Sequence, residues 1–434
     1  MQALLGRQSL RDLDLEALET AVRRQVLHLA GRAVEQRLNA DLSDAESPAR
    51  CECGQLARYA GRREKTFQSV LGPLRLQRAY FHCVACGEGF CPRDRQLGLE
   101  NTSLSPAVTR MVAAVGAMVS FEEGSQLLNE LAGVAVEARQ VERCAEALGA
   151  EIAVDEKQNV RPLDDAPLPS SLYLGVDGTG IPMRSSEVEG RKGKQLDGSA
   201  KTREVKLCTI WSAEARDAQD RPVRDEGSVT YTAAIESAAT ADTDEAPAAF
   251  TQRVLREASR RRFTQAERTV VLGDGAPWIW NLARELFPCA VQIVDRFHAK
   301  QHLSEVSKAL YGDSPPAQKW AQRRHEELDS GRVADLLRAL RRQADRSDIA
   351  RRCFQYIHRN QGRMTYPAFE AVGLCTSTGV VEAGCKVAIG TRLKRAGMHW
   401  STVGANSILA LRCCRLSGRF QDFWERRNDR RKAA

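Results

Sequence analysis

Hydrophobic and polar residues alternate along several short stretches in the middle of this chain, and the alternation predicts a β-sheet. The clearest stretch is 171–182, SLYLGVDGTGIP, in which apolar Leu172, Leu174 and Val176 precede Asp177 and a series of turn residues. An apolar run closed by Gly and Pro is typical of a buried strand, which we predict to end at Asp177. Further strands are predicted in 205–213, 228–235, 269–272 and 290–294.

Helical periodicity separates the later strands and follows them. Three strands, then helix, strand, helix and strand, predict an α/β protein with mixed strand directions. This is the element order of an RNase H-like core, and residues 166–298 form its first part. An all-α insertion is predicted over 299–372, and 373–434 return to the core with a helix carrying Glu382 and a basic C-terminal helix.

The region before this core is mainly helical. Residues 9 to about 40, within an N-terminal segment 1–45, have helical spacing and predict either a packing helix or an interaction helix. In 101–165, three short helices joined by tight turns resemble a DNA-binding helix-turn-helix, although a plain helical linker fits equally well. In the DNA-binding alternative, the third helix presents Arg139 and Arg143 to a major groove.

Two cysteine pairs predict a zinc ribbon in residues 46–100. Cys51 and Cys53 are separated from Cys83 and Cys86 by about thirty residues of alternating pattern, which suits tetrahedral thiolate coordination by a structural Zn²⁺. The first pair is C-x-C, tighter than the usual C-x-x-C, so Cys91 or His82 remains an alternative ligand. The basic residues on the hairpin between the pairs are candidate DNA contacts: Arg62, Arg63 and Lys65.

Composition places the chain among ordinary globular proteins of several domains. It has 434 residues, 43% hydrophobic and 28% charged, and no apolar run near the ~20 residues of a membrane helix. No signal peptide pattern is visible, so we expect a cytoplasmic protein whose 13 cysteines are free or metal-bound rather than disulfide-bonded. A formal net charge of +8, carried mainly by Arg clusters, permits a nucleic-acid partner.

Two acids follow separate apolar strands. Asp177 and Asp274 are each flanked by glycines, which let a ligand approach the backbone closely. Ligands of α/β sheets bind at the carboxyl ends of strands, and converging carboxylates are suited to a pair of Mg²⁺ or Mn²⁺ ions in phosphoryl transfer. Glu382, four residues before Lys386, could be a third metal ligand, but its own helix alone favours a helical ion pair with Lys386.

Long blocks of this sequence resemble the bacterial insertion-sequence transposases of the ISKra type, which are DDE transposases with an RNase H-like core. The blocks are CECGQLARYAGRREKTF with HCVACGEGFCPRD, then LYLGVDGTGIP, LGDGAPWIWNL, VDRFHAKQHL and TGVVEAGCK with RLKRAGMHWS. The resemblance implies a catalytic and metal-binding triad of Asp177, Asp274 and Glu382. It makes Asp295 and His298 supporting residues. The bases that follow Glu382 in the sequence are candidate DNA contacts in their own right: Lys386, Arg392 and Lys394.

The implied reaction is hydrolysis of a phosphodiester at a transposon end, followed by attack of the freed 3′-hydroxyl on target DNA. The implied partners are terminal inverted repeats, target DNA and further copies of the chain in a synaptic complex, in a bacterial, nucleoid-associated setting without a membrane. Two alternatives remain: an RNase H-like nuclease without strand transfer, and a catalytically silent DNA-binding protein derived from a transposase.

Overall fold

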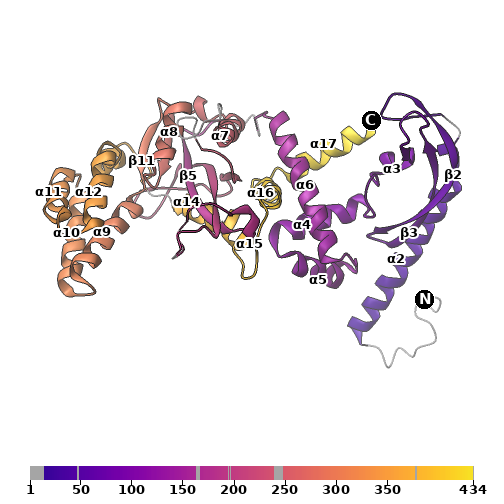
Figure 1. The fold of residues 1–434 in the computed structure, drawn as a ribbon, viewed down its shortest axis with the longest axis horizontal. Helices are drawn as coiled ribbons and strands as arrows, with labels where there is room; N and C mark the ends of the chain where they lie inside the picture. Colours follow the sequence, from indigo (N-terminus) through magenta and orange to yellow (C-terminus); the bar gives the residue numbers. More distant parts are fainter. Residues whose placement is uncertain are drawn as a thin grey trace. The chain divides into compact units, whose positions relative to one another are not determined.

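A computed structural model describes residues 14–45, 48–162, 167–193, 195, 197–238, 248–376 and 379–433. The chain forms two compact units (Figure 1). The first comprises Met1–Leu148 with Phe420–Ala434, and the second comprises Gly149–Arg419. Among the described helices, none is long and apolar enough to cross a membrane.

The first unit is built on the predicted β-hairpin. β2 (Leu56–Ser69) and β3 (Gly72–His82) pair antiparallel, with short β1 (Ala49–Arg50) and β4 (Gly89–Phe90) at the two edges. Gly72 has a φ of 99°, a conformation that glycine adopts without strain, and it starts β3 after the turn. The apolar faces of the two strands meet in a small core of Phe67, Leu74, Leu76 and Leu99.

The N-terminal helix α2 (Leu15–Ala40) lies along β3. Its start at Asp14 is capped by that side chain, which accepts from the backbone N–H of Ala17 at 2.7 Å; residues 1–13 lie outside the described chain. The Glu35 carboxylate and the Asn39 side-chain amide oxygen accept from the backbone N–H groups of Arg75 and Gln77, at 2.9 and 2.8 Å. These bonds satisfy an edge that would otherwise be open to pairing with another strand.

Helices complete the first unit, several of them with clear caps. The C-terminal helix also belongs to this unit, although we predicted it to return to the core. In α5 the Ser120 hydroxyl and the Glu123 carboxylate form a reciprocal capping box, and Gly133 ends the helix in the left-handed conformation. The helices of this part are α3 (Pro92–Leu97), α4 (Pro106–Met118), α5 (Phe121–Ala132), α6 (Ala138–Gln158), which continues into the second unit, and α17 (Phe420–Ala433).

The second unit contains a five-stranded mixed sheet of order β11-β10-β5-β6-β9, which confirms the predicted α/β class. β10 pairs parallel with both β5 and β11, whereas β6 pairs antiparallel with β5 and β9. The strands are β5 (Ser171–Pro182), β6 (Thr202–Ser212), β9 (Thr230–Ala234), β10 (Arg268–Gly273) and β11 (Val291–Val294).

β5 lies at the centre of this sheet and extends further than predicted. Its pairing with β10 stops at Val176, opposite Gly273, but its pairing with β6 continues to Pro182. The strand therefore does not end at Asp177, because β6 keeps the later residues hydrogen-bonded after β10 has turned away. Asp177 marks the end of the parallel pairing only.

Helices surround the sheet and cover its β9 edge. α7 (Ala249–Arg260) and α8 (Pro277–Leu286) follow β9 and β10 in the chain. α16 (Thr402–Leu416) packs on β9, where Asn406 and Ser417 side chains accept from the backbone N–H groups of Ile235 and Tyr231. Side chains of a helix thus accept from the unpaired N–H groups of this edge strand, as side chains of α2 do for β3.

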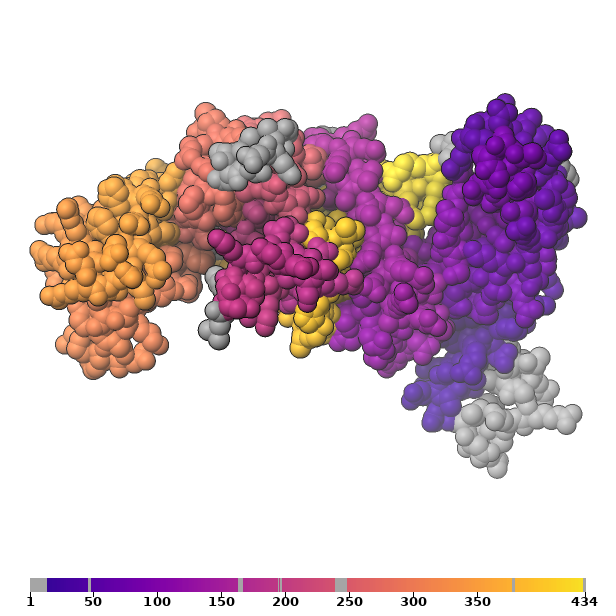
Figure 2. Space-filling view, in the orientation of Figure 1, coloured from indigo at the N-terminus to yellow at the C-terminus, as the bar shows by residue number. Residues whose placement is uncertain are grey.

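The predicted all-α insertion is present and forms one end of the second unit (orange in Figures 1 and 2). Its helices pack on one another through buried Leu328, Leu336, Leu340 and Ile357, which join the core of the sheet. They are α9 (Arg296–Tyr311), α10 (Pro315–Asp329), α11 (Val333–Ala344), α12 (Asp348–Asn360) and α13 (Tyr366–Ala371). After the insertion come α14 (Gly379–Gly384), the π-helical turn η7 (Cys385–Gly390) and α15 (Thr391–Leu393).

Candidate active site and cysteine cluster

Asp177 lies within β5, at the level where Asp274 follows the last residue of the neighbouring strand β10. Because Val176 pairs with Gly273 in the parallel ladder, the next residue of each strand is one of these acids. Burial raises the pKa of the Asp177 carboxyl, and the charge of Asp274 acts in the same direction. Hydrogen bonds from Cys385 and from the Gly178 N–H offset this only in part. A charged pair at this edge is therefore costly without a cation.

The turn after β10 is held by a helix of the insertion. The Tyr356 hydroxyl, on α12, donates to the backbone carbonyl of Asp274 at 2.7 Å, and the Asp274 carboxylate accepts from the Ala276 N–H at 2.8 Å. Gly275, between Asp274 and Ala276, has a φ of 97°, and a Cβ there would lie 2.5 Å from the Tyr356 ring. Sequence reasoning missed Tyr356, since nothing local links it to a residue 82 positions earlier.

The segment carrying Glu382 runs along the face of β5 that contains Asp177. Successive residues of that face contact successive parts of the segment. The Tyr173 hydroxyl accepts from the Cys375 N–H, and Gly175 adjoins Val381. Further along the strand, Asp177 accepts from the Cys385 thiol and Thr179 accepts from the Lys394 ammonium. Glu382 lies between the second and third of these contacts. It is one helical turn before Cys385, whose Sγ is 3.2 Å from Asp177 Oδ2.

The Glu382 side chain itself is exposed to solvent. Among the described residues, the ligand atoms of four cysteines converge as a metal site requires, whereas the three acids are not gathered that closely. The fold thus brings the Glu382 helix to the aspartates without closing the carboxylates around one point.

Asp295 and His298 adjoin the same edge. Asp295 is buried, its N–H donates to the carbonyl of Gly273 at 2.8 Å, and its carboxylate caps α9 by accepting from the His298 N–H at 2.9 Å. The His298 ring lies near enough for its charge to lower the pKa of Asp177. His302, one turn further, packs against the Tyr356 ring with centroids 4.5 Å apart.

The predicted DNA contacts after Glu382 differ in their surroundings. Lys386 and Lys394 are exposed. Arg392 is fully buried, and its guanidinium lies 5.2 Å from the centroid of the Trp400 ring. A buried guanidinium stacked on Trp packs the interior of the fold and offers no surface to a nucleic acid, so we leave Arg392 out of any DNA interface.

The four predicted zinc ligands converge in the first unit. The sulfur atoms of Cys51, Cys53, Cys83 and Cys86 all lie within 4.8 Å of one another, with Cys51–Cys86 at 3.5 Å and Cys53–Cys83 at 3.6 Å. A tetrahedral Zn²⁺ with Zn–S bonds of about 2.3 Å separates its sulfurs by about 3.8 Å. The cluster fits a structural zinc ion with the C-x-C pair included, and neither Cys91 nor His82 belongs to it.

Without a metal, the thiols of this cluster differ widely in pKa. The backbone N–H of Cys86 is the main cause that lowers the pKa of Cys83 to about 7. For Cys86 the N–H of Glu88 lowers the pKa, but hydrogen bonds with Cys51 and Cys83 outweigh it and leave the value at about 12. Four adjacent thiolates need a cation to ionise together, which again fits zinc.

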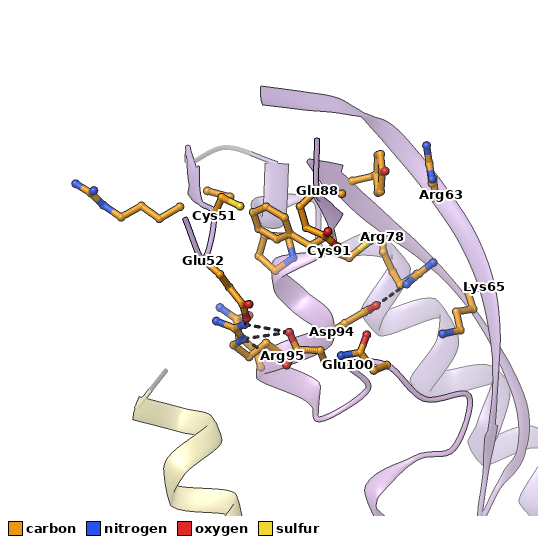
Figure 3. Close-up of a pocket in the computed structure, with 18 of the residues that line it drawn as sticks. Cys51, Glu52, Arg63, Lys65, Arg78, Glu88, Cys91, Asp94, Arg95 and Glu100 are labelled. Atoms are coloured by element: carbon orange, nitrogen blue, oxygen red, sulfur yellow. Dashed lines mark hydrogen bonds and ion pairs between the residues drawn. The ribbon is translucent and has the colours of Figure 1, made fainter. Parts of the chain in front are cut away.

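A hollow of about 990 Å³ lies beside the cluster on the hairpin (Figure 3). Arg63 is exposed and stacks on the Tyr80 ring, 3.3 Å from its centroid, while Lys65 donates to the carbonyl of Thr102 at 2.8 Å. Arg62 points elsewhere and is bound by Asp44 at 2.9 Å and by the carbonyl of Gln77 at 2.8 Å. Three of the acids around the hollow pair with other arginines: Asp94 with Arg78, and both Glu52 and Glu100 with Arg95.

On α6, Arg139 and Arg143 are both exposed and lie four residues apart, on one side of the helix. Gln140, between them, donates to the Ser103 hydroxyl at 2.8 Å. The two arginines are therefore accessible to a polyanion.

The model of an uncharacterised protein family, UPF0236, matches residues 11–428. The chain belongs to this family. No curated protein matches it. Among solved structures it is similar to a Drosophila P element transposase strand transfer complex, with 8% sequence identity over 77% of this chain and 84% of that chain. The TM-score of 0.27 is too low for this likeness to carry an argument about fold or function.

Proposed function

We propose that this protein is a DNA transposase of the DDE type, similar to the ISKra group, that cleaves and joins DNA at an RNase H-like core. The observation that carries the proposal is the pairing of Val176 with Gly273, which sets Asp177 and Asp274 side by side at the carboxyl end of the parallel pairing between β5 and β10. The helix of Glu382 packs over the same edge through Cys385. Two carboxylates follow one another on adjacent parallel strands, and a third acid, Glu382, lies one helical turn before the residue that contacts Asp177. This arrangement suits phosphoryl transfer.

The residues present fit a pair of Mg²⁺ or Mn²⁺ ions. Carboxylate oxygens are the ligands these ions prefer, and the raised pKa of Asp177 reflects a buried charge that a cation would stabilise. When bound, the ions activate the attacking oxygen and stabilise the leaving oxygen. The chain orients the carboxylates: the Gly178 N–H and the Cys385 thiol hold Asp177, and the Ala276 N–H holds Asp274. Glu382 completes the set by turning its exposed side chain toward Asp177.

The DNA partners are transposon terminal inverted repeats and target DNA. Lys386 and Lys394 are exposed beside the proposed site and suit contacts with the phosphate backbone. Arg63, Arg139 and Arg143 are the accessible cations of the first unit that we assign to DNA ends. The zinc ribbon has a structural role in this proposal, and the protein acts as a homo-oligomer in a synaptic complex in the bacterial nucleoid.

The decisive experiment incubates the purified chain with end-bearing DNA and a plasmid target in Mg²⁺ or Mn²⁺. Joined products are expected from the wild type, and none from Asp177→Asn, which should still bind DNA. Glu204→Gln is the matched control, because Glu204 adjoins Gly178 on the opposite face of the sheet and should leave joining intact. Nicking without joining would favour the nuclease instead, and binding without cleavage the silent DNA-binding protein.

A further inference from the structure

The helix α2 carries apolar residues on two opposite sides. One side packs on the hairpin: Gly31 lies so close to Leu71 that a Cβ would be 3.0 Å from its carbonyl oxygen, and Leu38 joins the core around Phe67. The other side is a stripe defined by Leu15, Val22, Val26, Leu29 and Ala33. Their spacings of seven, four, three and four residues keep them on one face of an α-helix.

Most of this stripe is open to solvent in the described chain, and only Val22 is half-buried. Leu15 is 69% exposed, Leu29 58% and Val26 48%. Single exposed apolar residues are common on protein surfaces, but several in helical register form a continuous face, which marks an interaction site. A face of this kind packs well against another helix.

Charges beside the stripe indicate what the other helix is. Glu19 and Arg37 both adjoin the stripe and are both exposed. They are 18 residues apart, which is five full turns, so they lie on the same side of the helix, about 27 Å from each other. In an antiparallel pair of two α2 helices, Glu19 of each copy faces Arg37 of the other. In a parallel pair the two-fold axis runs along the helices and puts the charged sides of the two copies on opposite sides of the interface, so neither of these ion pairs forms.

We propose that this chain dimerises through α2, whose apolar stripe packs antiparallel on the stripe of a second copy. A two-fold axis near the middle of α2, close to residue 28, sets Val26 of one copy beside Leu29 of the other and repeats each contact once. The axis also forms two Glu19–Arg37 ion pairs. Stable interfaces bury at least ~1,200 Å² of surface. A single pair of helices buries a small area by this standard, so we expect the dimer to dissociate on dilution.

Sedimentation of the full-length chain over a range of concentrations tests the dimer. We expect a monomer–dimer equilibrium for the wild type and a monomer for the double substitution Val26→Glu, Leu29→Glu. Both positions are exposed, so the thermal unfolding temperature should be unchanged, which separates loss of the interface from loss of the fold. Arg24→Glu, on the side of the helix opposite the stripe, is the matched control and should still dimerise.

A charge exchange tests the orientation. Glu19→Lys and Arg37→Glu should each weaken the dimer about tenfold, because each places like charges together twice, and the combined variant should restore it. A wild type that is monomeric at all concentrations overturns the proposal and leaves the stripe to a different occupant, such as residues 1–13 or another protein. An oligomer unaffected by the stripe substitutions, or an exchange that fails to restore the dimer, overturns it equally.

Discussion

The Cys385 thiol donates a hydrogen bond of 3.2 Å to Oδ2 of Asp177, across 208 residues of sequence. The bond ties the π-helical turn that follows Glu382 to the central strand of the sheet. Single π-helical turns inside α-helices are frequent at functional sites, because they shift the register of the side chains that follow. Cys385 thus fixes one oxygen of Asp177 and the position of the Glu382 helix together.

Removal of this thiol should impair DNA cleavage without unfolding the protein. We expect Cys385→Ala to reduce the cleavage rate about three- to tenfold, the effect of one lost hydrogen bond to a carboxylate. Cys385→Ser keeps a donor and should stay within about twofold of the wild type. Cys289→Ser, at an exposed thiol, serves as the control in single-turnover assays. Equal rates for Cys385→Ala and the wild type would contradict a positioning role.

Asp177→Asn should stabilise the metal-free protein. Since burial raises the pKa of Asp177, its ionised form costs stability above the unfolded-state pKa, whereas an amide avoids that cost. The free energy of unfolding, measured by urea titration in EDTA at pH 7, should rise by about 1 kcal/mol. The difference from the wild type should shrink as the pH falls through the folded-state pKa of Asp177 and disappear below the unfolded-state pKa. Mn²⁺ should raise the melting temperature of the wild type but not of the variant.

Glu257→Gln should have the opposite effect. Burial alone would raise the pKa of Glu257, but Arg419 and Arg260 outweigh it and lower the value. The buried carboxylate accepts from Arg419 at 2.9 and 3.0 Å and from Arg260 at 3.2 Å. Loss of this charge should cost about 3–5 kcal/mol at pH 7.

Acid titration separates the two carboxylates. Because the folded-state pKa of Glu257 is lowered, its contribution is present above its unfolded-state pKa and is lost as the pH falls through the folded-state value. The acid-induced loss of stability should therefore be shallower in Glu257→Gln than in the wild type. An unchanged acid slope would refute this assignment.

Zinc content should depend on four cysteines and no others. We expect Cys51→Ser and Cys83→Ser to lose the metal and to lower the melting temperature of the first unit. Cys91→Ser, at a thiol next to the hollow but outside the cluster, should retain about one zinc per chain. Metal analysis of the purified variants decides between them, and zinc loss in Cys91→Ser would show that the ligand set is different.

Tyr356→Phe should loosen the turn that presents Asp274. The lost bond to the Asp274 carbonyl should cost about 1 kcal/mol of stability and slow cleavage several-fold. Gly275→Ala should be more damaging, because alanine is strained at a φ of 97° and its Cβ meets the Tyr356 ring. Tyr311→Phe, on a surface-exposed ring of α9, should change neither quantity. Normal cleavage by both Tyr356→Phe and Gly275→Ala would show that α12 does not help to position Asp274.

Local patterns were sufficient to predict most elements and several site residues. The apolar runs of β5, β6, β9, β10 and β11, the capping box at Ser120 and the two cysteine pairs are each encoded within a few neighbouring residues. Their periods and turn residues follow from backbone sterics, which act at short range. The sequence by itself thus determined that Asp177 and Asp274 follow apolar runs and that a metal-binding hairpin precedes the sheet.

Only the tertiary structure decided which residues meet. Nothing local reveals that β10 lies beside β5, that Cys385 and Tyr356 reach the two aspartates, or that Arg392 is buried under Trp400 and Arg62 is held by Asp44. It also decided that β5 continues past Asp177 and that α2 keeps an apolar face exposed. These outcomes depend on strand order and burial, which arise from the packing of segments distant in sequence and have no short-range periodicity.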